Sequence, residues 1–186
     1  MKPEPRWELL LGKATLAAAW NVQGPAATAP FVDEVQRSFG LSLPAVPNTR
    51  AQGDGLAALW LGPSSWLLVA GGSSSLTDFA AKRDALNAAG GALFDVSASR
   101  VAYTIAGPRA SDLLAKACPL DFHSRAFPPE SVAQSLLWHV NALFIKRADD
   151  DYAVLVARSY ARDVWRALRE SGAQYGHREL QAIPFR

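Results

Sequence analysis

Histidine and cysteine side chains are the first candidates for chemistry in this sequence of 186 residues. His123, His139 and His177 stand far apart in the chain, and none has the spacing of a metal ligand set. A histidine without a charged partner is a weak signal for acid–base chemistry, so structural roles are favoured for all three. Cys118 is the only cysteine, which excludes a disulfide within the chain. It ends a predicted helix, whereas a reactive thiolate is favoured at a helix start, so core packing is the favoured role.

Acidic and glycine-rich stretches give no stronger signal. The run Asp149, Asp150 and Asp151 lacks the glycine and the terminal glutamate of a calcium loop, which favours a solvated turn. Gly71 and Gly72 precede three serines, but no Gly-Lys-Ser/Thr follows, so a flexible connection is favoured over a phosphate loop. A Gly-x-Gly-x-x-Gly fingerprint after a strand is also missing. These motifs therefore predict no nucleotide or flavin site on the chain.

Composition excludes several other classes of protein. The 19 basic and 17 acidic residues are interspersed, without the basic run that marks nucleic-acid binding. The apolar run 9–20 is interrupted and too short to cross a bilayer, so we expect no membrane association and a cytoplasmic location. Hydrophobic residues make up 49% of the sequence, and six residues are Trp. This composition predicts a well-packed hydrophobic core, with apolar surface left over to contact a partner.

Periodicity and turn residues predict the elements that must position these side chains. Apolar residues at 31, 32, 35 and 39 predict a helix that Pro30 begins and Gly40 ends. Residues 1–13 are predicted to be a loosely held arm that packs on another subunit or on the chain itself. The predicted strands are 14–22, 56–61, 65–69, 93–97, 100–106, 134–140, 142–147 and 152–157, and the predicted helices are 30–39, 76–89, 109–118 and 160–170.

This order predicts an α+β fold with mostly antiparallel sheets, helices packed on them and two small lobes. Residues 1–22 would form the arm and the first strand, and residues 23–90 the first lobe. The second lobe would span residues 91–172, and residues 173–186 would be a tail.

A set of short motifs, taken together, has a specific order and spacing. They are Trp60–Leu68, Asp95–Arg100, Ile105–Ala110, Leu113–Leu114, Cys118–Asp121, Arg125–Pro129, Ala133–Gln134 and Leu155–Tyr160. Over residues 55–170 this order resembles the gamma subunit of heterotetrameric sarcosine oxidase. The wider resemblance is to the folate-binding fold of the glycine-cleavage aminomethyltransferase (T-protein), whose members share an Asp-Val-Ser strand and a helix-opening Gly-Pro.

The scaffold residues of these motifs are Asp95, Ser97, Arg100, Gly107 and Pro108. Asp95 and Ser97 can hydrogen-bond neighbouring backbone and hold the strand connection. Gly107 permits a sharp turn from strand to helix, and Pro108 fixes φ for the first helical turn. Such roles imply a fold and not an activity.

One departure from the resembling family is informative. Catalytic folate-binding relatives carry a Gly-Gly-x-x-Asp-Asp-type stretch between the two strands after this helix, and it supplies a carboxylate near the folate amine. The corresponding stretch here, 140–146, has neither an acid nor paired glycines. The resemblance therefore implies a structural copy of the fold, with no catalytic, cofactor-binding or metal-binding residue.

The resemblance implies a non-catalytic subunit of an oxidoreductase complex that demethylates sarcosine. FAD, FMN, NAD, tetrahydrofolate and zinc would then lie on the partner alpha, beta and delta subunits. The alternative is a free-standing tetrahydrofolate-binding protein or aminomethyltransferase-like enzyme, with Asp95, Asp121 or the Asp149 cluster as the carboxylate. Trp7, Arg125 and Phe127 are the candidate interface residues, because aromatic and Arg side chains anchor many interfaces.

Overall fold

The structure is a computed structural model that describes residues 8–53, 55–71 and 77–185. The Cα positions divide the chain into two compact units. Unit 1 comprises residues 1–14, 101–129 and 134–183, and unit 2 comprises residues 15–100, 130–133 and 184–186. The predicted boundary between the two lobes, near Gly90, falls inside unit 2. The predicted lobes were continuous in sequence, whereas each unit combines segments that are far apart in the chain.

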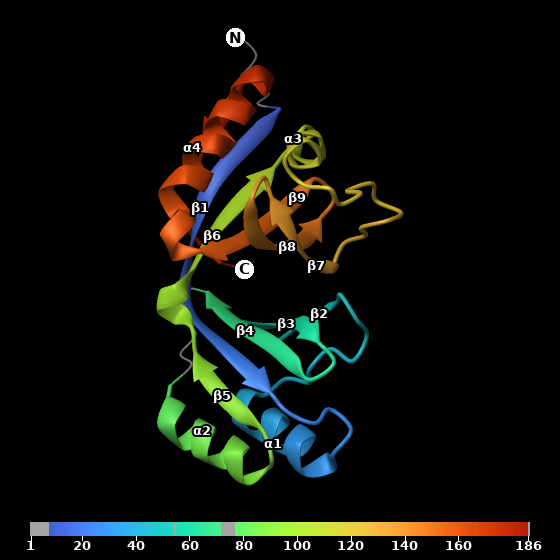
Figure 1. Ribbon diagram of the computed structural model, residues 1–186, viewed down its shortest axis with the longest axis vertical. Helices are drawn as coiled ribbons and strands as arrows, with labels where there is room; N and C mark the ends of the chain where they lie inside the picture. The colour runs from blue at the N-terminus through green and yellow to red at the C-terminus, as the bar shows by residue number, and fades with distance from the viewer. Residues whose placement is uncertain (1–7, 54, 72–76, 186) are drawn as a thin grey trace, which may run out of the picture. The chain divides into compact units, whose positions relative to one another are not determined.

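Unit 1 contains the first half of β1 (Leu9–Gln23) and the strands and helices that follow Arg100 (Figure 1). They are β6 (Arg100–Ala106), α3 (Ala110–Ala117), β7 (Val132–Leu137), β8 (Val140–Ala148), β9 (Asp151–Ala157), α4 (Ala161–Gly172), β10 (His177–Glu179) and β11 (Ile183–Pro184). Three of these strands cross the boundary of the unit: β6 and β7 begin just outside it, and β11 ends just outside it. The strand order is β1-β6-β9-β8-β7, and β10 pairs in parallel with β1.

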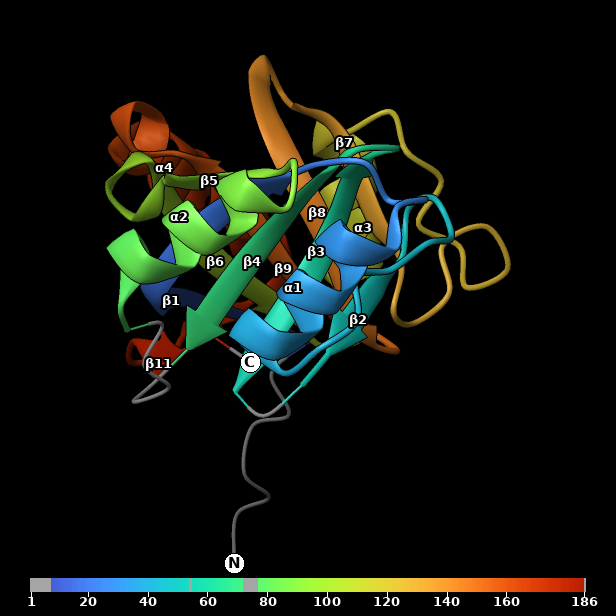
Figure 2. The ribbon, with the colours of Figure 1, turned by 90° about the horizontal axis from the view of Figure 1, so that it is seen from below.

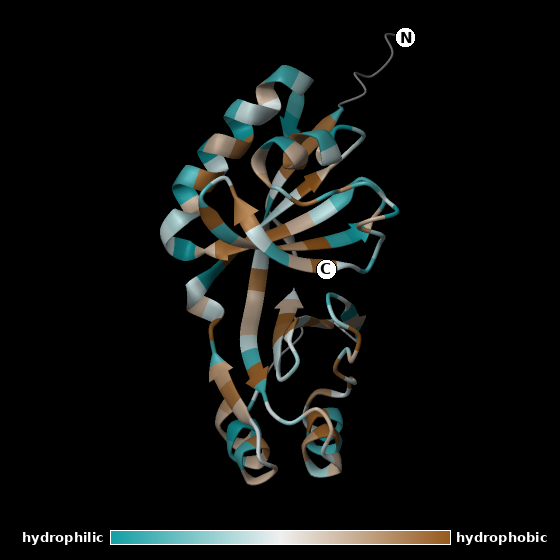
Figure 3. Ribbon diagram, turned by 45° about the vertical axis from the view of Figure 1, so that its right-hand side comes forward, coloured by the Kyte–Doolittle hydropathy of each residue, from teal (hydrophilic) through white to brown (hydrophobic). Residues whose placement is uncertain are grey.

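The sheet of unit 1 is mostly antiparallel. β1 pairs with β6 from Leu10↔Ala106 to Ala14↔Ala102, and β8 pairs with β9 from Ala142↔Val156 to Lys146↔Tyr152. α4 buries Val164 and Leu168, which lie four residues apart on one helical face. Its opposite face is hydrophilic (Figure 3).

Unit 2 contains the second half of β1 and, among its described residues, six further helices and strands. They are α1 (Ala29–Phe39), β2 (Arg50–Gln52), β3 (Leu56–Gly62), β4 (Ser65–Gly71), α2 (Phe79–Ala88) and β5 (Ala92–Asp95). The strands follow the order β2-β3-β4-β1, and β5 pairs with β1. Both helices lie on one face of this sheet (Figure 2). A core cluster joins Phe31 and Val35 of α1 and Leu86 of α2 to strand residues such as Trp20 and Trp66.

The predicted α+β class, with antiparallel sheets and helices packed on them, is confirmed. The predicted helix 76–89 is observed as α2, and Leu76 lies outside the described residues. α1 starts with Pro30 in its first turn and ends at Gly40, whose φ of 67° is left-handed. The short edge strand β2 was not predicted, because three residues are too few for an alternating pattern.

Two terminal expectations are corrected. Residues 9–13 are not a loose arm, because they form β1 and the side chains of Leu9 and Leu11 are completely buried. Gly12 lies within β1, and a Cβ there would lie 2.5 Å from Thr104 Oγ1, so close strand packing explains the glycine. Nor is 173–186 only a tail, since β10 and β11 both pair with β1.

Candidate functional site

The Asp95–Ser97 motif forms a hydrogen-bonded junction in unit 2. Asp95 ends β5, and its Oδ1 accepts hydrogen bonds from the Ser97 N–H at 2.9 Å and from the Ser97 hydroxyl at 2.6 Å. Ser97 Oγ in turn accepts a hydrogen bond from the Ala19 N–H of β1 at 2.9 Å. The neighbouring Val96 N–H donates to the Ala19 carbonyl at 2.9 Å. The motif thus fixes the connection after β5 to the middle of β1, and Arg100 then begins β6, half-buried.

The Gly107–Pro108 motif forms the turn from β6 to α3 in unit 1. Gly107 has a φ of 106°, and a Cβ there would lie 2.7 Å from the Glu8 carbonyl oxygen. Its N–H donates to the Asp150 carbonyl at 2.9 Å, while the Arg109 N–H donates to the Glu8 carbonyl at 3.0 Å. Only glycine combines this backbone conformation with such close chain packing.

Arg109, directly after this turn, is exposed to solvent and paired with two acids. Its guanidinium donates to Asp112 at 2.9 Å and to Glu8 at 3.3 Å. The hydrogen bond to Asp112, followed by that to Glu8, raises the pKa of Arg109 above its ordinary value. Arg109 is therefore a constant positive charge at the start of α3.

The acid-free stretch 140–146 is strand β8, and it is packed into the core. Ala142, Leu143, Phe144 and Ile145 are all buried. Lys146 is only 2% exposed, yet its Nζ lies 3.6 Å from Asp149 Oδ1 and 5.6 Å from the centre of the Tyr152 ring. Its ammonium is thus stabilised by a partly solvated carboxylate and by a cation–π contact.

These β8 residues do not fit a folate site of the kind that the T-protein resemblance implies. That chemistry needs a carboxylate near the folate amine, whereas β8 offers buried apolar groups, Asn141 and the cations Lys146 and Arg147. A lysine side chain does not supply a carboxylate, and a cation does not stabilise an iminium ion. Acid–base chemistry on folate therefore has no supporting group in this strand.

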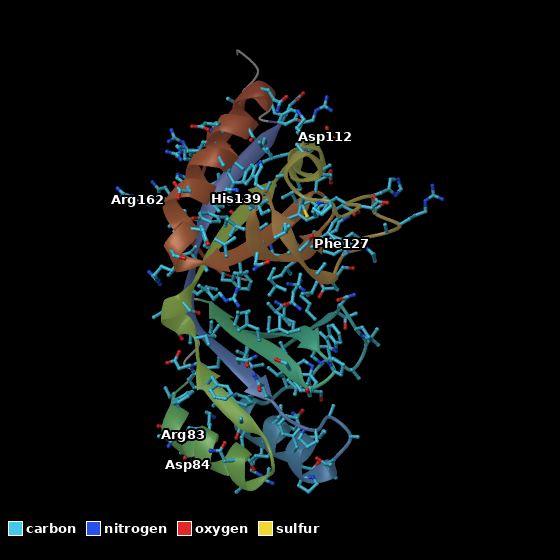
Figure 4. All side chains as sticks on the ribbon, in the orientation of Figure 1. Arg83, Asp84, Asp112, Phe127, His139 and Arg162 are labelled. Atoms are coloured by element: carbon cyan, nitrogen blue, oxygen red, sulfur yellow. The ribbon has the colours of Figure 1, made fainter. Side chains whose placement is uncertain are left out.

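The structure keeps the histidines apart. His123 lies in an exposed loop, where Nδ1 accepts a hydrogen bond from the Arg125 N–H at 3.3 Å. His139 is exposed at the turn between β7 and β8 (Figure 4), and His177 is half-buried in β10. Cys118 is buried after the end of α3. Within the described residues, no group of three or more His, Cys, Asp or Glu side chains could hold a metal ion.

Two of the three carboxylates in the acidic run 149–151 are paired with cations of β8. Asp149 faces Lys146, and Asp151 forms an ion pair with Arg147. Asp150 has a φ of 53° and contributes its carbonyl, not its carboxylate, to the Gly107 turn. The acidic run therefore has structural partners on both sides.

The three candidate interface residues differ in their exposure to solvent, as far as the structure describes them. Trp7 lies outside the described residues, and Arg125 is exposed in the loop after α3. Phe127 is only 6% exposed and packs edge-to-face on Phe122, with the ring centres 5.8 Å apart (Figure 4). The expectation that the proline-rich loop offers Phe127 to a partner is corrected, since this side chain belongs to the core of unit 1.

Sequence reasoning missed an aromatic stack beside α4. The Trp165 ring stacks on Tyr103 of β6 at 5.6 Å and 14°, and Lys13 Nζ lies 5.1 Å from the Trp165 ring centre. The Tyr103 hydroxyl donates to the Ala161 carbonyl, and burial raises the pKa of Tyr103 to about 12. No local pattern marks this group, because its members come from three separate elements.

Two grooves are lined by residues of one unit each. In unit 1, a groove of ≈ 260 Å³ between α4 and the β7–β8 turn is lined by Trp138, His139, Asp163 and Arg166, among others. In unit 2, a smaller apolar groove of ≈ 180 Å³ lies between α1 and the loop that contains Pro44. The Trp66 Nε1–H donates to the Pro44 carbonyl at 2.9 Å, which fixes that loop.

In the described part of the chain, no helix is long and apolar enough to cross a membrane.

Comparisons with solved structures show the fold. A chain of the heterotetrameric sarcosine oxidase from Corynebacterium sp. U-96, in complex with pyrrole 2-carboxylate, matches 95% of this chain and 90% of its own length. The TM-score is 0.83 at 22% identity. The glycine cleavage system aminomethyltransferase T from Bartonella henselae matches 95% of this chain and 48% of its own length, with a TM-score of 0.66 at 16% identity. The chain is therefore similar in fold to part of that aminomethyltransferase.

Sequence comparisons agree with this result. Sarcosine oxidase subunit gamma of Corynebacterium sp. (strain U-96) is 28% identical over 169 residues, which cover 91% of this chain and 73% of the relative. The gamma subunit from Arthrobacter sp. is 32% identical over 119 residues, covering 63% of this chain and 58% of the relative. The model of the sarcosine oxidase, gamma subunit family matches residues 23–174, most of the chain. The chain therefore belongs to the sarcosine oxidase gamma subunit family.

Proposed function

We propose that this chain is a non-catalytic structural subunit of a sarcosine oxidase-type complex, in which larger subunits carry out the oxidative demethylation of sarcosine. The observation that carries the proposal is strand β8. In residues 140–146, the stretch that corresponds to the one where the resembling folate enzymes hold a carboxylate, this strand has apolar side chains, Asn141 and the cation Lys146, and no acid.

The packing of β8 supports a scaffold role. Leu143 pairs with Leu155 and Phe144 with Val154 across the ladder to β9, and all four residues are buried. These side chains fill the interior of unit 1 and leave no polar group to orient a pterin ring. The same residues contribute stability through apolar burial, which a structural subunit needs.

The proposal assigns the cofactors and the chemistry to partners. The alpha, beta and delta subunits of the complex would hold FAD, FMN, NAD, tetrahydrofolate and zinc, and the assembly would be cytoplasmic. Among the described residues of this chain, the lack of a His, Cys and carboxylate cluster supports placing the zinc elsewhere.

Co-expression with the larger subunits tests the structural role. The chain should elute with them as one complex in size-exclusion chromatography coupled to light scattering. The complex lacking this chain should lose thermal stability. Elution of the chain as an isolated monomer, with the remaining subunits intact and equally stable, would refute the proposal.

Turnover by the assembled complex tests the non-catalytic role. Lys146→Met keeps the apolar stem of the side chain and removes the charge, so sarcosine-dependent oxygen consumption per assembled complex should not change. A fall in kcat of about 100-fold without loss of assembly is the size of effect produced by removing an acid–base group, and it would place β8 in the reaction.

A second candidate, a tetrahydrofolate-binding protein, is favoured by the likeness to the aminomethyltransferase fold. Isothermal titration of the isolated chain with tetrahydrofolate separates the two functions. Micromolar binding, about −8 kcal/mol, would support the second candidate. Heat signals equal to those of dilution would support the structural role.

A further inference from the structure

The start of α4 carries an unusual group of exposed side chains, which we call the basic–aromatic surface. It consists of Lys13, Arg158, Tyr160, Arg162 and Trp165, and all five belong to unit 1. Lys13, Arg158 and Arg162 are exposed, Tyr160 is 44% exposed, and Trp165 is half-buried. Arg162 is labelled on α4 in Figure 4.

The position of Arg162 conflicts with the stability of the helix. Arg162 is the second residue of α4, where the positive end of the helix dipole repels a cation. Arg158 lies four residues earlier, in the 3-10 turn that leads into the helix, so a like charge is close by. Residues that break local rules without a structural gain are expected at functional sites.

Neighbouring acids do not resolve this conflict. Asp163 is engaged by Arg166 at 3.2 Å, and Arg166 also lies 4.0 Å from Glu170. Among residues 8–53, 55–71 and 77–185, Arg162 forms no ion pair. The more distant Arg169 differs, since it is near the favourable end of the dipole and forms an ion pair with Glu179. Among the described residues, the charge of Arg162 at the start of the helix is therefore left without an acidic partner.

Trp165 is held in place on its unit by two contacts. Trp165 lies flat on Tyr103, and Lys13 sits near its ring, so little conformational entropy is lost when another surface covers the group. Tyr, Trp and Arg are the residue types that dominate binding energy at protein interfaces. A rigid aromatic floor bordered by three cations fits a protein surface that presents carboxylates.

We propose that the basic–aromatic surface of unit 1 docks an acidic surface of another subunit of the sarcosine oxidase-type complex. This inference rests on the proposed function. A nucleic acid fits less well, because Asp163 and Glu170 are close by on α4 and the net charge of the chain is only +2.

The test uses the full-length chain and the purified complex of the other subunits, with Arg162→Glu as the main variant. Arg162→Glu places an acid at the start of α4, so the thermal midpoint of the isolated chain should stay equal or rise. Its affinity for the other subunits should fall about 10-fold or more at low salt, and the difference should shrink at high salt. Opposite effects on stability and on binding distinguish a docking residue from a structural one.

Two control variants define the comparison. Arg83→Glu makes the same charge change on α2, where Arg83 is exposed and paired with Asp84, and it should leave the affinity within about twofold. Arg162→Lys keeps the charge and should retain most of the affinity. If the wild-type chain does not bind the other subunits, the proposed function itself fails. If it binds and Arg162→Glu behaves as Arg83→Glu does, only the docking surface is refuted.

Two further results would also refute the docking surface. One is binding of an RNA oligonucleotide that Arg162→Glu abolishes while subunit affinity is unchanged. The other is self-association of the isolated chain, seen by sedimentation velocity, that Arg162→Glu alone abolishes. Arg158→Glu, outside the helix, provides an independent second variant with the same expected loss of affinity.

Discussion

Replacement of Gly107 by alanine tests the structural meaning of the Gly-Pro turn. A φ of 106° is outside the region that L-residues adopt readily, and the cost is about 2 kcal/mol. The new Cβ would also lie 2.7 Å from the Glu8 carbonyl oxygen, which is a backbone atom and cannot move without shifting the start of β1. We add about 1 kcal/mol for this contact, in the range of overpacking effects, and expect about 3 kcal/mol in total.

Gly176 provides the matched control in the same unit. Its φ is 65°, and nothing lies within 4 Å of the position that a Cβ would take. Gly176→Ala should therefore cost only the backbone term, about 1 kcal/mol. The difference between the two variants isolates the close approach to Glu8.

Thermal unfolding followed by circular dichroism, together with urea titration, measures both variants. For a chain of this size, 1 kcal/mol lowers Tm by about 2–4 °C, so Gly107→Ala should lower it by about 10 °C and Gly176→Ala by about 3 °C. If Gly107→Ala is no more destabilising than Gly176→Ala, the chain adapts at this turn and the packing argument is wrong.

Three more predictions concern side chains with defined partners. Ser97→Ala removes the acceptor for the Ala19 N–H and should lower the free energy of unfolding by about 1–2 kcal/mol in urea. The pKa of Tyr103 is raised from 10.0 to about 12 in the folded state, so stability should fall as the pH rises from about 10 to about 12, and Tyr103→Phe should remove this dependence. Glu130→Ala leaves the guanidinium of Arg50, whose side chain is 4% exposed, without its bidentate partner, and we expect a loss of about 2 kcal/mol because Glu130 itself is half exposed.

Each of these predictions has an internal comparison. Ser99→Ala removes an exposed hydroxyl that donates to the Val96 carbonyl, so it should cost less than Ser97→Ala. Absorbance of the phenolate should show one tyrosine ionising above the others, and a single unperturbed titration would contradict the buried Tyr103. Glu170→Ala breaks only a long surface contact with Arg166 and should change stability by less than about 0.5 kcal/mol. A loss from Glu130→Ala as small as that would show that Arg50 is solvated.

Local patterns in the sequence predicted most of the elements. Apolar spacing and the flanking Pro30 and Gly40 marked α1, and the Gly107–Pro108 pair marked the turn into α3. These signals are local, because helix periodicity and turn chemistry act over a few residues. The order of the short motifs was also sufficient to place the chain in its family. The absence of an acidic residue from 140–146 was read from the sequence alone.

Only the tertiary structure decided the roles that depend on distant contacts. No local pattern marks the close approach of Gly12 to Thr104, and the segment 177–179 was predicted to be part of a tail although it pairs with β1. Phe127 lies in a proline-rich loop that resembled an exposed site, yet Phe122 covers it. Trp165 packs on Tyr103 and lies near Lys13, which are both far away in sequence. Burial and charge pairing depend on contacts between residues that are distant in sequence, and local sequence patterns do not specify those contacts.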